Sequence, residues 1–522
     1  MSIQIGIDLG TTNSVVACFR RGRTEIIPID GKRTFPSVLS IRGRELLVGN
    51  QAKSRLLIDP RNSIASTKRD IGKDVIYSIG NMPFTPEDVA FNILKAIREK
   101  TSEYLGEEVE DAVITVPAYF TSEQRESTQN AAKKAGFNVL RLMPEPTAAA
   151  LDYGIDQNKD QIIMVYDLGG GTFDISIVRV CGNEFEVLAV DGDSHLGGDD
   201  FDKVIADILM EDINRDLGIY LKGNLDKKYI GAITKIKEAA EKAKIDLTEM
   251  DETNIMLPNL IDDYCLDRNI TREEFNSRAM FLVNKTISKV DNVLNREKLT
   301  KNDIDRVILV GGSTKMPIIK EVITNRVKEP YIAENVDEVI ARGAALMAYS
   351  LTTPDEEKGN SKIDLKKEIN VIEKTVFTYG IDMLNEFGEL FYEPIIKRGT
   401  NLPASGGVIG STSRPYQCEV VMEVFRGESP DIRYNEYLGK LSLGLEASCE
   451  CALPVLALFE IDENMIITFR SAQIPLREPY IKLIYDNDIE LLKYCVDNGE
   501  FNSTEVKIDA NVKVKRRRYG PA

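Results

Sequence analysis

The sequence predicts an α/β protein in two parts, a large portion with two lobes and a smaller antiparallel β portion. Three observations support this prediction. Short apolar runs alternate with helical patterns from Met1 to about Leu351, and one motif occurs twice in that region. After residue 368, β-rich segments separated by Gly, Pro and Ser turns take over. The 522 residues suffice for about three or four compact units of ~100–200 residues.

The strands and helices of the first part follow from apolar pattern and end signals. Thr121 with Gln124 forms a capping box, which predicts a helix ending at Gly136. An apolar stripe with helical spacing predicts a second helix over 228–247. Buried strands are predicted at 2–8, 112–116, 162–167 and 306–310. In the second part, strands are predicted at 392–396, 418–425, 456–461, 465–469 and 480–485.

The domain boundaries follow from composition. Residues 1–351 form the α/β part, and the polar segment 352–375, with Pro354 and Gly359, is interpreted as a linker. Residues 376–486 are the β module. Residues 487–522 are a short tail with one helical candidate at 489–496 and a basic end, which we interpret as a solvated terminus rather than an anion-binding segment.

Composition excludes several functions. The chain carries 83 acidic and 66 basic residues and a net charge of −17, which disfavours a dedicated nucleic-acid binder. The single histidine, His195, excludes a two-histidine zinc site, and a Ser-His-Asp triad would have to use it. The seven cysteines are scattered without a CxxC pair, so we expect reduced thiols, and Cys449-Glu450-Cys451 is interpreted as two thiols in or beside a strand. We see no signal peptide and no apolar run of ~18 residues, and expect a soluble cytoplasmic protein that binds no membrane.

The repeated motif is a strand that ends in Asp and is followed by a Gly/Thr-rich turn. It occurs at Ile5–Asn13 with Asp8 and again, about 160 residues later, at Met164–Thr172 with Asp167. Glycines let backbone amides approach an anion, and an Asp beside phosphate requires Mg²⁺ between them. A single such turn is common, but the pair predicts two lobes that clamp the phosphates of a magnesium nucleotide.

A third glycine turn, at 307–317, suits a base or ribose that passes over bare backbone. The sequence contains no Walker A motif and no GxGxxG, so neither a P-loop fold nor dinucleotide chemistry is supported.

Seven motifs in order carry a resemblance to a known family. They are IGIDLGTTNS, VITVPAYF, EPTAAALDYG, YDLGGGTFDIS, HLGGDDFD, EAAEKAK and VILVGGSTKMP. This set resembles the DnaK-type seventy-kilodalton heat-shock chaperones, strongly from residue 3 to about 350 and weakly to about 470. The resemblance implies an actin-like ATPase of two lobes with ATP or ADP and Mg²⁺ between them, then a β-sandwich that grips extended peptides.

The resemblance also implies roles for individual residues. Asp8 and Asp167 would hold the water shell of the magnesium ion, and Lys68, Glu145, Thr172 and Asp174 would serve hydrolysis. The phosphates would be cradled by Gly10, Thr11, Thr12, Asn13, Gly169, Gly170, Gly171 and Thr172. The rest of the nucleotide pocket would be Gly197, Gly198, Asp199, Glu241, Lys244, Thr248, Gly311, Gly312, Ser313, Lys315 and Asp337.

Two of these assignments have a plain alternative. From the sequence alone, Glu241 and Lys244 are surface charges on a helix. His195 matches the family's loop histidine near the phosphates, for which we favour a structural hydrogen bond over proton transfer. Glu145 precedes Pro146, which favours an extended conformation at Glu145.

Coupling between the two parts is implied for Pro117, Arg125 and Arg141, which match family positions for interlobe signalling and contact with a J-domain co-chaperone. It is also implied for Glu373, which stands where the family linker usually ends in Asp. Segment 369–373 matches the apolar interdomain linker of the family, but Asn370 interrupts its apolar run. We therefore expect weaker docking of this linker.

Several features depart from typical members. Region 68–117 is compact, and 254–277 is short where many members bind a nucleotide exchange factor. Both features resemble the HscC-type branch and suggest fast intrinsic exchange or an unusual exchange factor. After Asp486 too few residues remain for a helical lid, so we expect fast peptide release from a chain that is mostly monomeric.

A rough alignment places five residues in the peptide cleft, with ordinary sandwich core as the alternative: Ile381, Leu384, Ile409, Val420 and Met422.

Three functions compete. The first is an ATP-driven chaperone, in which hydrolysis switches the peptide affinity of the β module. The second is an actin-fold kinase for a small molecule, which would not explain the linker and β module. The third is a binding protein in which ATP only locks a conformation, which Lys68 with Glu145 and Thr172 disfavours.

Overall fold

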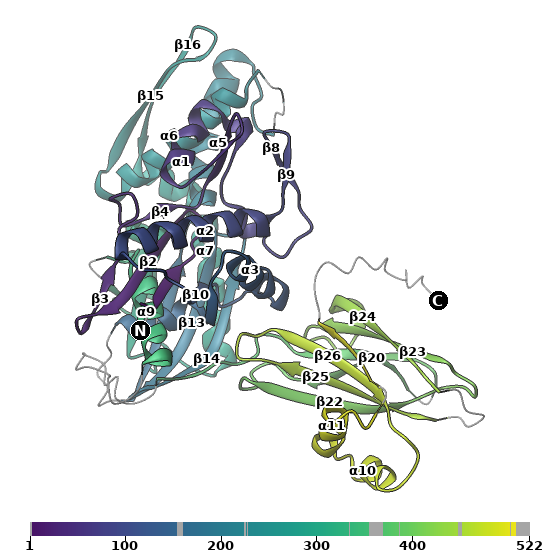
Figure 1. Cartoon of the computed structure of the whole chain (residues 1–522). Helices are drawn as coiled ribbons and strands as arrows, with labels where there is room; N and C mark the ends of the chain where they lie inside the picture. The colour runs from purple at the N-terminus through teal and green to yellow at the C-terminus, as the bar shows by residue number, and fades with distance from the viewer. Residues whose placement is uncertain are drawn as a thin grey trace. The chain divides into compact units, whose positions relative to one another are not determined.

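The computed structural model describes residues 3–153, 160–223, 226, 228–332, 335–353, 369–385, 387–446, 452–501 and 503–507 (Figure 1). The chain divides into two compact units. The first contains nearly all residues up to Val371, and the second contains Ile372 onward together with the short segments Gly72–Asp74 and Thr121–Glu126. Most of the expected linker, residues 354–368, lies outside the described residues, and so does Cys449-Glu450-Cys451. No helix among the described residues is long and apolar enough to span a membrane.

The first lobe is built on a mixed sheet with the strand order β11-β10-β1-β2-β3. Its strands are β1 (Ile5–Asp8), β2 (Asn13–Arg20), β3 (Arg23–Ile26), β10 (Asp111–Val116) and β11 (Asn138–Pro144), with β4 (Phe35–Pro36) paired to β2. Small sheets add β5 (Leu39–Arg42), β6 (Glu45–Val48), β7 (Ser63–Ile64), β8 (Tyr77–Ile79) and β9 (Met82–Phe84). The helices are α1 (Asn50–Ile58), α2 (Pro86–Leu105), α3 (Ser122–Lys134) and α4 (Glu145–Asp152), with a 3-10 turn at Thr67–Asp70.

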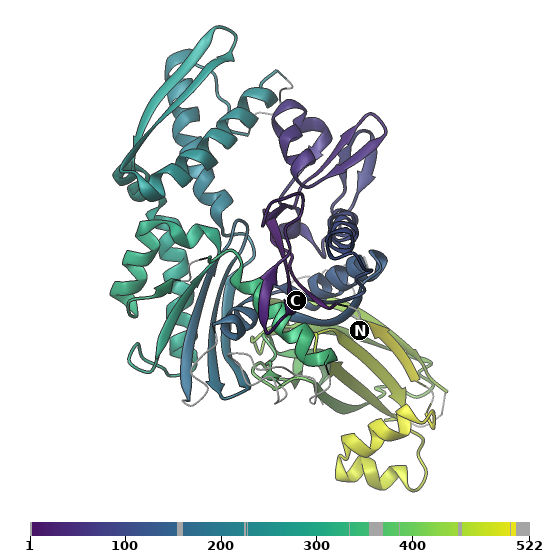
Figure 2. The same cartoon turned by 60° about the vertical axis from the view of Figure 1, so that its left-hand side comes forward.

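The second lobe repeats this plan with the order β18-β17-β12-β13-β14 and β19 at the edge (Figure 2). Its strands are β12 (Gln161–Leu168), β13 (Phe173–Cys181), β14 (Glu184–Asp193), β17 (Arg306–Val310), β18 (Tyr331–Ile332) and β19 (Asn370–Ile372), and β15 (Glu252–Ile261) and β16 (Tyr264–Thr271) form a separate hairpin. The helices are α5 (Gly198–Leu217), α6 (Ile230–Glu249), α7 (Arg272–Arg296), α8 (Pro317–Arg326) and α9 (Val339–Thr352).

The two sheets correspond strand by strand. β1 and β12 each pair in parallel with one neighbour and antiparallel with the other, and each ends at the Asp of the repeated motif or one residue beyond it. Helices α4 and α9 cross between the sheets so closely that a Cβ on Gly343 would lie 1.8 Å from the carbonyl oxygen of Ala148. The duplication predicted from the motif is confirmed, and so are all four predicted strands of this part.

The predicted helix starts are largely confirmed. The backbone N–H of Thr121 donates to Gln124 Oε1 at 3.0 Å, and the N–H of Gln124 donates to Thr121 Oγ1 at 3.4 Å, as a capping box requires. Gly136 follows α3 with a φ of +91°, a backbone conformation that favours glycine. The helix predicted over 228–247 is α6, displaced by two residues at each end.

The described part of the second unit contains two antiparallel sheets of four strands, ordered β21-β20-β23-β24 and β22-β25-β26-β27. The strands are β20 (Tyr379–Leu384), β21 (Leu390–Ile396), β22 (Ala404–Ser411), β23 (Glu419–Arg426), β24 (Glu436–Gly444), β25 (Pro454–Ile461), β26 (Ile467–Gln473) and β27 (Ser503–Lys507). Their buried faces supply the core, including Ile381, Val424, Leu441, Phe459 and Phe469.

The strand predicted at 480–485 is wrong, because this segment forms the helix α10 (Tyr480–Asp486). Its aromatic and β-branched residues suggested a strand, but Tyr480, Leu483 and Ile484 have helical spacing and all pack on one apolar cluster. Helix α11 (Ile489–Asp497) matches the helical candidate of the tail. The strand β27 then pairs with β26, so the β unit continues past residue 486.

Candidate functional site

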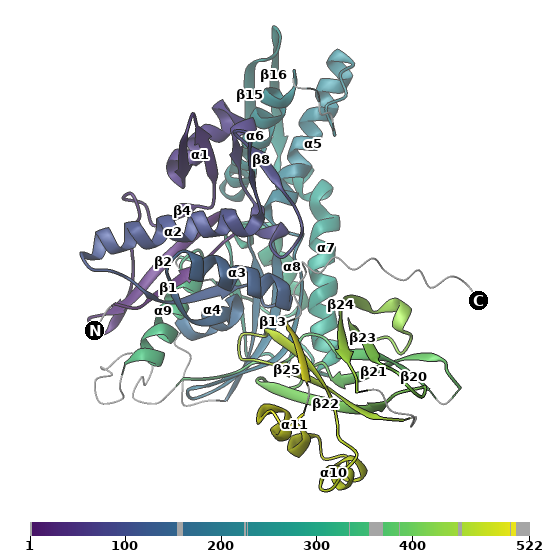
Figure 3. The same cartoon turned by 45° about the vertical axis from the view of Figure 1, so that its right-hand side comes forward.

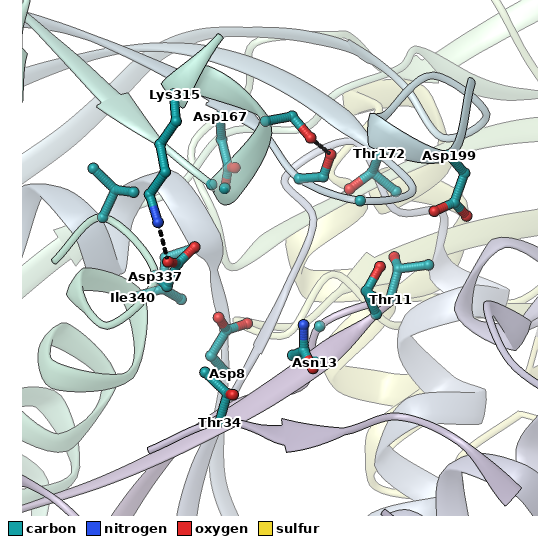
Figure 4. A pocket seen from close by; sticks show the side chains of 18 of the residues that line it. Asp8, Thr11, Asn13, Thr34, Asp167, Thr172, Asp199, Lys315, Asp337 and Ile340 are labelled. Carbon is teal, nitrogen blue, oxygen red and sulfur yellow. Dashed lines mark hydrogen bonds and ion pairs between the residues drawn. The ribbon is translucent and has the colours of Figure 1, made fainter. Parts of the chain in front are cut away.

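A cavity of about 410 Å³ lies where the two repeated turns face each other (Figure 4). Asp8 and Asn13 enter it from the first lobe, and Asp167 and Thr172 from the second. The strands β1 and β12 deliver the two acids to the cavity, because each strand ends there and its glycine turn follows. The geometry is the two-sided clamp that the repeated motif predicts.

Most of the predicted pocket residues line this one cavity. They are Asp8, Gly10, Thr11, Thr12, Asn13, Lys68, Glu145, Asp167, Gly169, Gly170, Thr172, Asp199, Glu241, Lys244, Thr248, Gly311, Gly312, Ser313, Lys315 and Asp337. Gly171, Asp174, Gly197 and Gly198 are not among the lining residues. The two residues that looked like surface charges, Glu241 and Lys244, therefore lie in the pocket.

The glycine turns hold the two lobes in close contact beside the cavity. A Cβ on Gly170 would lie 2.0 Å from Thr12 Oγ1, so only glycine permits this approach of the two repeated turns. The N–H groups of Gly198 and Asp199 donate to the carbonyl oxygens of Gly169 and Gly170, at 2.9 and 2.8 Å. Gly198 does not line the cavity, but its hydrogen bond to Gly169 holds the second repeated turn in place.

Buried acids dominate the floor of the cavity. Burial, together with the carboxylate of Glu145, raises the pKa of Asp8 to about 7 against the effect of Lys68. Burial also raises the pKa of Asp167, with Glu145 and Asp174 adding to the shift. The floor thus holds more carboxylates than Lys68 can neutralise, which is an environment suited to a cation.

Lys68 and Glu145 form the central ion pair of the floor. Lys68 Nζ donates to Glu145 Oε1 at 2.6 Å, and both side chains are less than a tenth exposed. Glu145 is the first residue of α4, not the extended residue that Pro146 led us to expect. Proline is tolerated in a first helical turn because its missing N–H would have no partner there.

The residues present fit a magnesium nucleotide. Among the described residues, Asp167 Oδ2 and Thr12 Oγ1 are buried without a hydrogen-bond partner, so an acceptor and a hydroxyl remain for a ligand. No group of three or more metal-ligating side chains converges within the described ranges. Asp8 and Asp167 would be the carboxylates that hold Mg²⁺, which takes one or two carboxylates in proteins and otherwise keeps water.

The far wall of the cavity comes from one face of α6 and from the third glycine turn. Lys244 Nζ pairs with Asp202 at 2.8 Å. Lys315 Nζ pairs with Asp337 at 2.7 Å, as Figure 4 shows. Burial raises the pKa of Asp202 to about 6 despite Lys244. The sequence analysis missed several lining residues: Val15, Thr34, Asp202, Ile245, Met316, Val336 and Ile340. Helical spacing from Glu241 and Thr248 would have indicated Ile245.

Comparison with known proteins decides the family. The Hsp70 protein family profile matches residues 4–478. The chain is 39% identical over 474 residues to the "Chaperone protein DnaK" of Thermotoga neapolitana and to that of Thermotoga maritima, covering 89% of this chain and 77% of each relative. The chain belongs to the Hsp70 family.

Membership in the Hsp70 family establishes the activity in outline. The chain is a DnaK-type ATP-dependent chaperone and an ATPase, with an actin-like nucleotide-binding part and an antiparallel β part for substrate. Of the three competing functions, family membership therefore supports the chaperone over the small-molecule kinase and over the protein in which ATP only locks a conformation. The profile ends at residue 478, so α10, α11 and β27 lie beyond the matched region.

Two predicted residues, Asp174 and His195, are not among the residues that line the Hsp70 cavity. Asp174 is buried, and its Oδ1 accepts the backbone N–H of Tyr119 at 3.1 Å. His195 is exposed, its Nδ1 lies 3.0 Å from Ser194 Oγ, and its backbone N–H donates to Asp193 Oδ1 at 2.9 Å. These contacts agree with the structural interpretation of His195.

The residues predicted to couple the two parts of this Hsp70 protein are buried or form backbone hydrogen bonds. Pro117 follows β10 and accepts the N–H of Phe120 at 3.1 Å, and Arg125 and Glu373 are both buried. Segment β19 joins the second-lobe sheet beside β14, where the N–H of Asn370 donates to Asn183 O at 3.0 Å. Arg141 donates to Val371 O at 3.3 Å. Asn370 thus pairs through its backbone, which any side chain permits.

The five residues assigned to the peptide cleft separate into three groups. Ile381 and Met422 are buried in the sandwich core, which was the alternative for this set. Ile409 packs on the cluster under α10 and α11, so this face of β22 is covered by helices. Leu384 is 54% exposed and Val420 is half-buried, and these two remain available to a peptide.

Proposed function

We propose that the cavity binds ATP with Mg²⁺, and that hydrolysis there switches the affinity of the β unit for extended peptides. The buried pair of Lys68 and Glu145, next to Asp8 and Asp167, supports this proposal most directly. Bound Mg²⁺ would supply positive charge there, which offsets the negative charge of the phosphates during hydrolysis. Asp8 and Asp167 hold its water shell, and the unpartnered Asp167 Oδ2 supplies an acceptor for it.

Each side chain of the floor has a distinct task. Lys68 approaches the transferred phosphate and stabilises the charge that develops on it, because an ammonium in a water-poor site interacts strongly. Glu145 holds Lys68 in place and, with Thr172, orients the attacking water. Asp174 supports this geometry from behind, through the loop that contains Tyr119.

The ribose and base lie between α6 and the third glycine turn. Glu241, Lys244 and Thr248 face them from α6, and Lys315 covers the opposite wall. Ile245 offers the base an apolar contact. Lys315 already forms an ion pair with Asp337, so it binds the base less strongly than an unpaired lysine would. This weaker contact favours fast release of ADP.

The β unit binds peptide at the ends of its strands. The loop after β20 and the loop after β22 start side by side, since Met383 Cε lies 3.4 Å from the Cβ position of Gly410. Large exposed apolar side chains gather on these segments and on β23: Leu384 (54%), Phe387 (79%), Tyr416 (67%) and Val421 (45%). Helices α10 and α11 precede β27 and pack on β22, β25 and β26, so they do not serve as a lid.

The remaining assignments rest on family resemblance. We propose a J-domain co-chaperone that acts through Pro117, Arg125, Arg141 and Glu373, a cytoplasmic location and a mostly monomeric chain. The hairpin of β15 and β16 is the place for an exchange factor. The likeness to the HscC-type branch rests on the compact 68–117 region and the short 254–277 region.

Single-turnover hydrolysis of ATP with excess enzyme tests the site. Lys68→Ala should lower the rate about 100-fold or more while ATP still binds, the loss typical for one preorganised group. Lys95→Ala is the matched control, because Lys95 lies on α2 with a side chain 54% exposed. Equal rates for the wild type and Lys68→Ala would contradict the assignment.

A further inference from the structure

A buried acid outside the cavity collects an unusual number of donors. Asp191, on β14, is 5% exposed and accepts Lys289 Nζ at 3.0 Å and Asn292 Nδ2 at 3.2 Å. Arg296 approaches it at 3.6 Å and also donates to the carbonyl oxygen of Val190 at 2.8 Å. The three donors share one face of α7, at spacings of three and four residues, so a single carboxylate links α7 to β14. Figure 3 shows α7 as a long helix.

The cluster around Asp191 lies on β14, next to the strand β13 that contains Asp174. β13 and β14 pair so that Asp191 is opposite Ile175 and Gly192 is opposite Asp174. A Cβ on Gly192 would lie 2.7 Å from the carbonyl oxygen of Phe173 and 3.3 Å from both Asp174 Oδ1 and Tyr119 Cβ. The glycine therefore lets the Tyr119 loop pack directly on Asp174.

Lys289 connects the cluster to that loop. Its ammonium lies 6.0 Å from the centroid of the Tyr119 ring, at the limit for a cation–π contact, while Asp191 holds it in place. The backbone N–H of Tyr119 donates in turn to Asp174 Oδ1 at 3.1 Å. A continuous path of contacts thus runs from α7 through Lys289 and Tyr119 to Asp174.

We infer that Lys289 and Asp191 are positioning residues for ATP hydrolysis. They fix the Tyr119 loop and thereby the direction of the Asp174 carboxylate, while neither residue lines the cavity. The inference rests on the proposed role of Asp174. It makes α7 a site from which hydrolysis can be tuned without a change in nucleotide affinity.

The test measures single-turnover hydrolysis and the Kd of ATP for Lys289→Met in the full chain. We expect the rate to fall roughly 2- to 30-fold with the Kd of ATP unchanged, the range for residues that act through neighbours. Lys289→Arg should restore most of the rate. Lys285→Met is the matched control, one turn earlier on α7 with an exposed side chain, and should keep the wild-type rate.

The double variant separates positioning from general loosening. In the Asp174→Asn background, Lys289→Met should have no further effect, because both changes act through one carboxylate. Additive losses, or a wild-type rate for Lys289→Met, would overturn the inference. A wild-type rate for Asp174→Asn would instead overturn the proposed role of Asp174. If Lys289→Met does not fold, Tyr119→Leu tests the same path: it should lower the rate only when Asp174 is intact, and a wild-type rate would count against the path.

Discussion

Asp382 is a carboxylic acid in the β unit whose surroundings disfavour its charged form. Its Oδ1 accepts the backbone N–H of Glu423 at 2.7 Å, just beyond the point where β20 stops pairing with β23. Burial, with the nearby Glu423 carboxylate adding, raises the pKa of Asp382 to about 6. Burial raises the pKa of Tyr437, with the Glu423 and Asp382 carboxylates adding to the shift. The folded β unit therefore holds a proton on Asp382 that the unfolded chain releases at lower pH.

Asp382→Asn should remove this pH dependence. With a raised pKa in the folded state, Asp382 lowers the free energy of unfolding as the pH rises from about 4 to about 6. The wild type should lose stability relative to Asp382→Asn over this window, as measured by urea unfolding at several pH values. Asp431→Asn is the control of opposite sign, because Arg433 lowers the pKa of Asp431. A constant difference between wild type and Asp382→Asn from pH 4 to 7 would show that Asp382 is not perturbed.

The sequence predicted some residues of the site correctly and missed others. Asp8 and Asp167 were found because a strand ending and a glycine turn mark them twice. Ile409 packs under α10 and α11, and the sequence could not indicate this because the apolar pattern of β22 does not fix which face a residue takes. Asp202 was missed because only the tertiary fold brings this α5 residue beside Lys244 at the cavity.

At the scale of elements, the helical hairpin of α10 and α11 is an integral part of the β unit. Leu492 and Ile474 are almost fully buried with Leu456 and Leu458 in one cluster. Lys493 pairs with Glu460 at 2.8 Å, and Asp497 pairs with Arg470 at 2.6 Å. The hairpin therefore covers the outer face of the sheet that contains β25 and β26.

Leu492→Ala should destabilise the β unit by about 2–5 kcal/mol, the cost of a cavity in a core. Its neighbour Leu491 is 50% exposed, so Leu491→Ala should change stability by no more than about 0.5 kcal/mol. Thermal unfolding of the full chain, followed by circular dichroism, compares the two. Equal melting curves for both variants would mean that the hairpin does not pack on the sheet.

Element prediction succeeded where pattern and end signals agreed. The capping box of Thr121 and Gln124 and the apolar stripe of α6 are examples. It failed for α10, because a seven-residue segment rich in Tyr and Ile has no decisive period. It also failed for β27, a short polar strand that forms only because the edge of β26 is available.

At the scale of the molecule, the repeated motif predicted two lobes and a site between them, and the matching strand orders confirm the duplication. The repeat could not indicate Lys68 or Glu241, because each occurs once and reaches the cavity only through the tertiary fold. Those residues came from family resemblance, and the cavity brings them together.

The central claim is that hydrolysis at Lys68 controls peptide binding by the β unit. The most direct test is the dissociation rate of a fluorescent extended peptide from the full chain with ATP and with ADP. We predict release about tenfold or more faster with ATP, within the usual range of coupling between sites. In Lys68→Ala, ATP should keep release fast because it is not converted to ADP. Equal release with ATP and ADP in the wild type would contradict the claim.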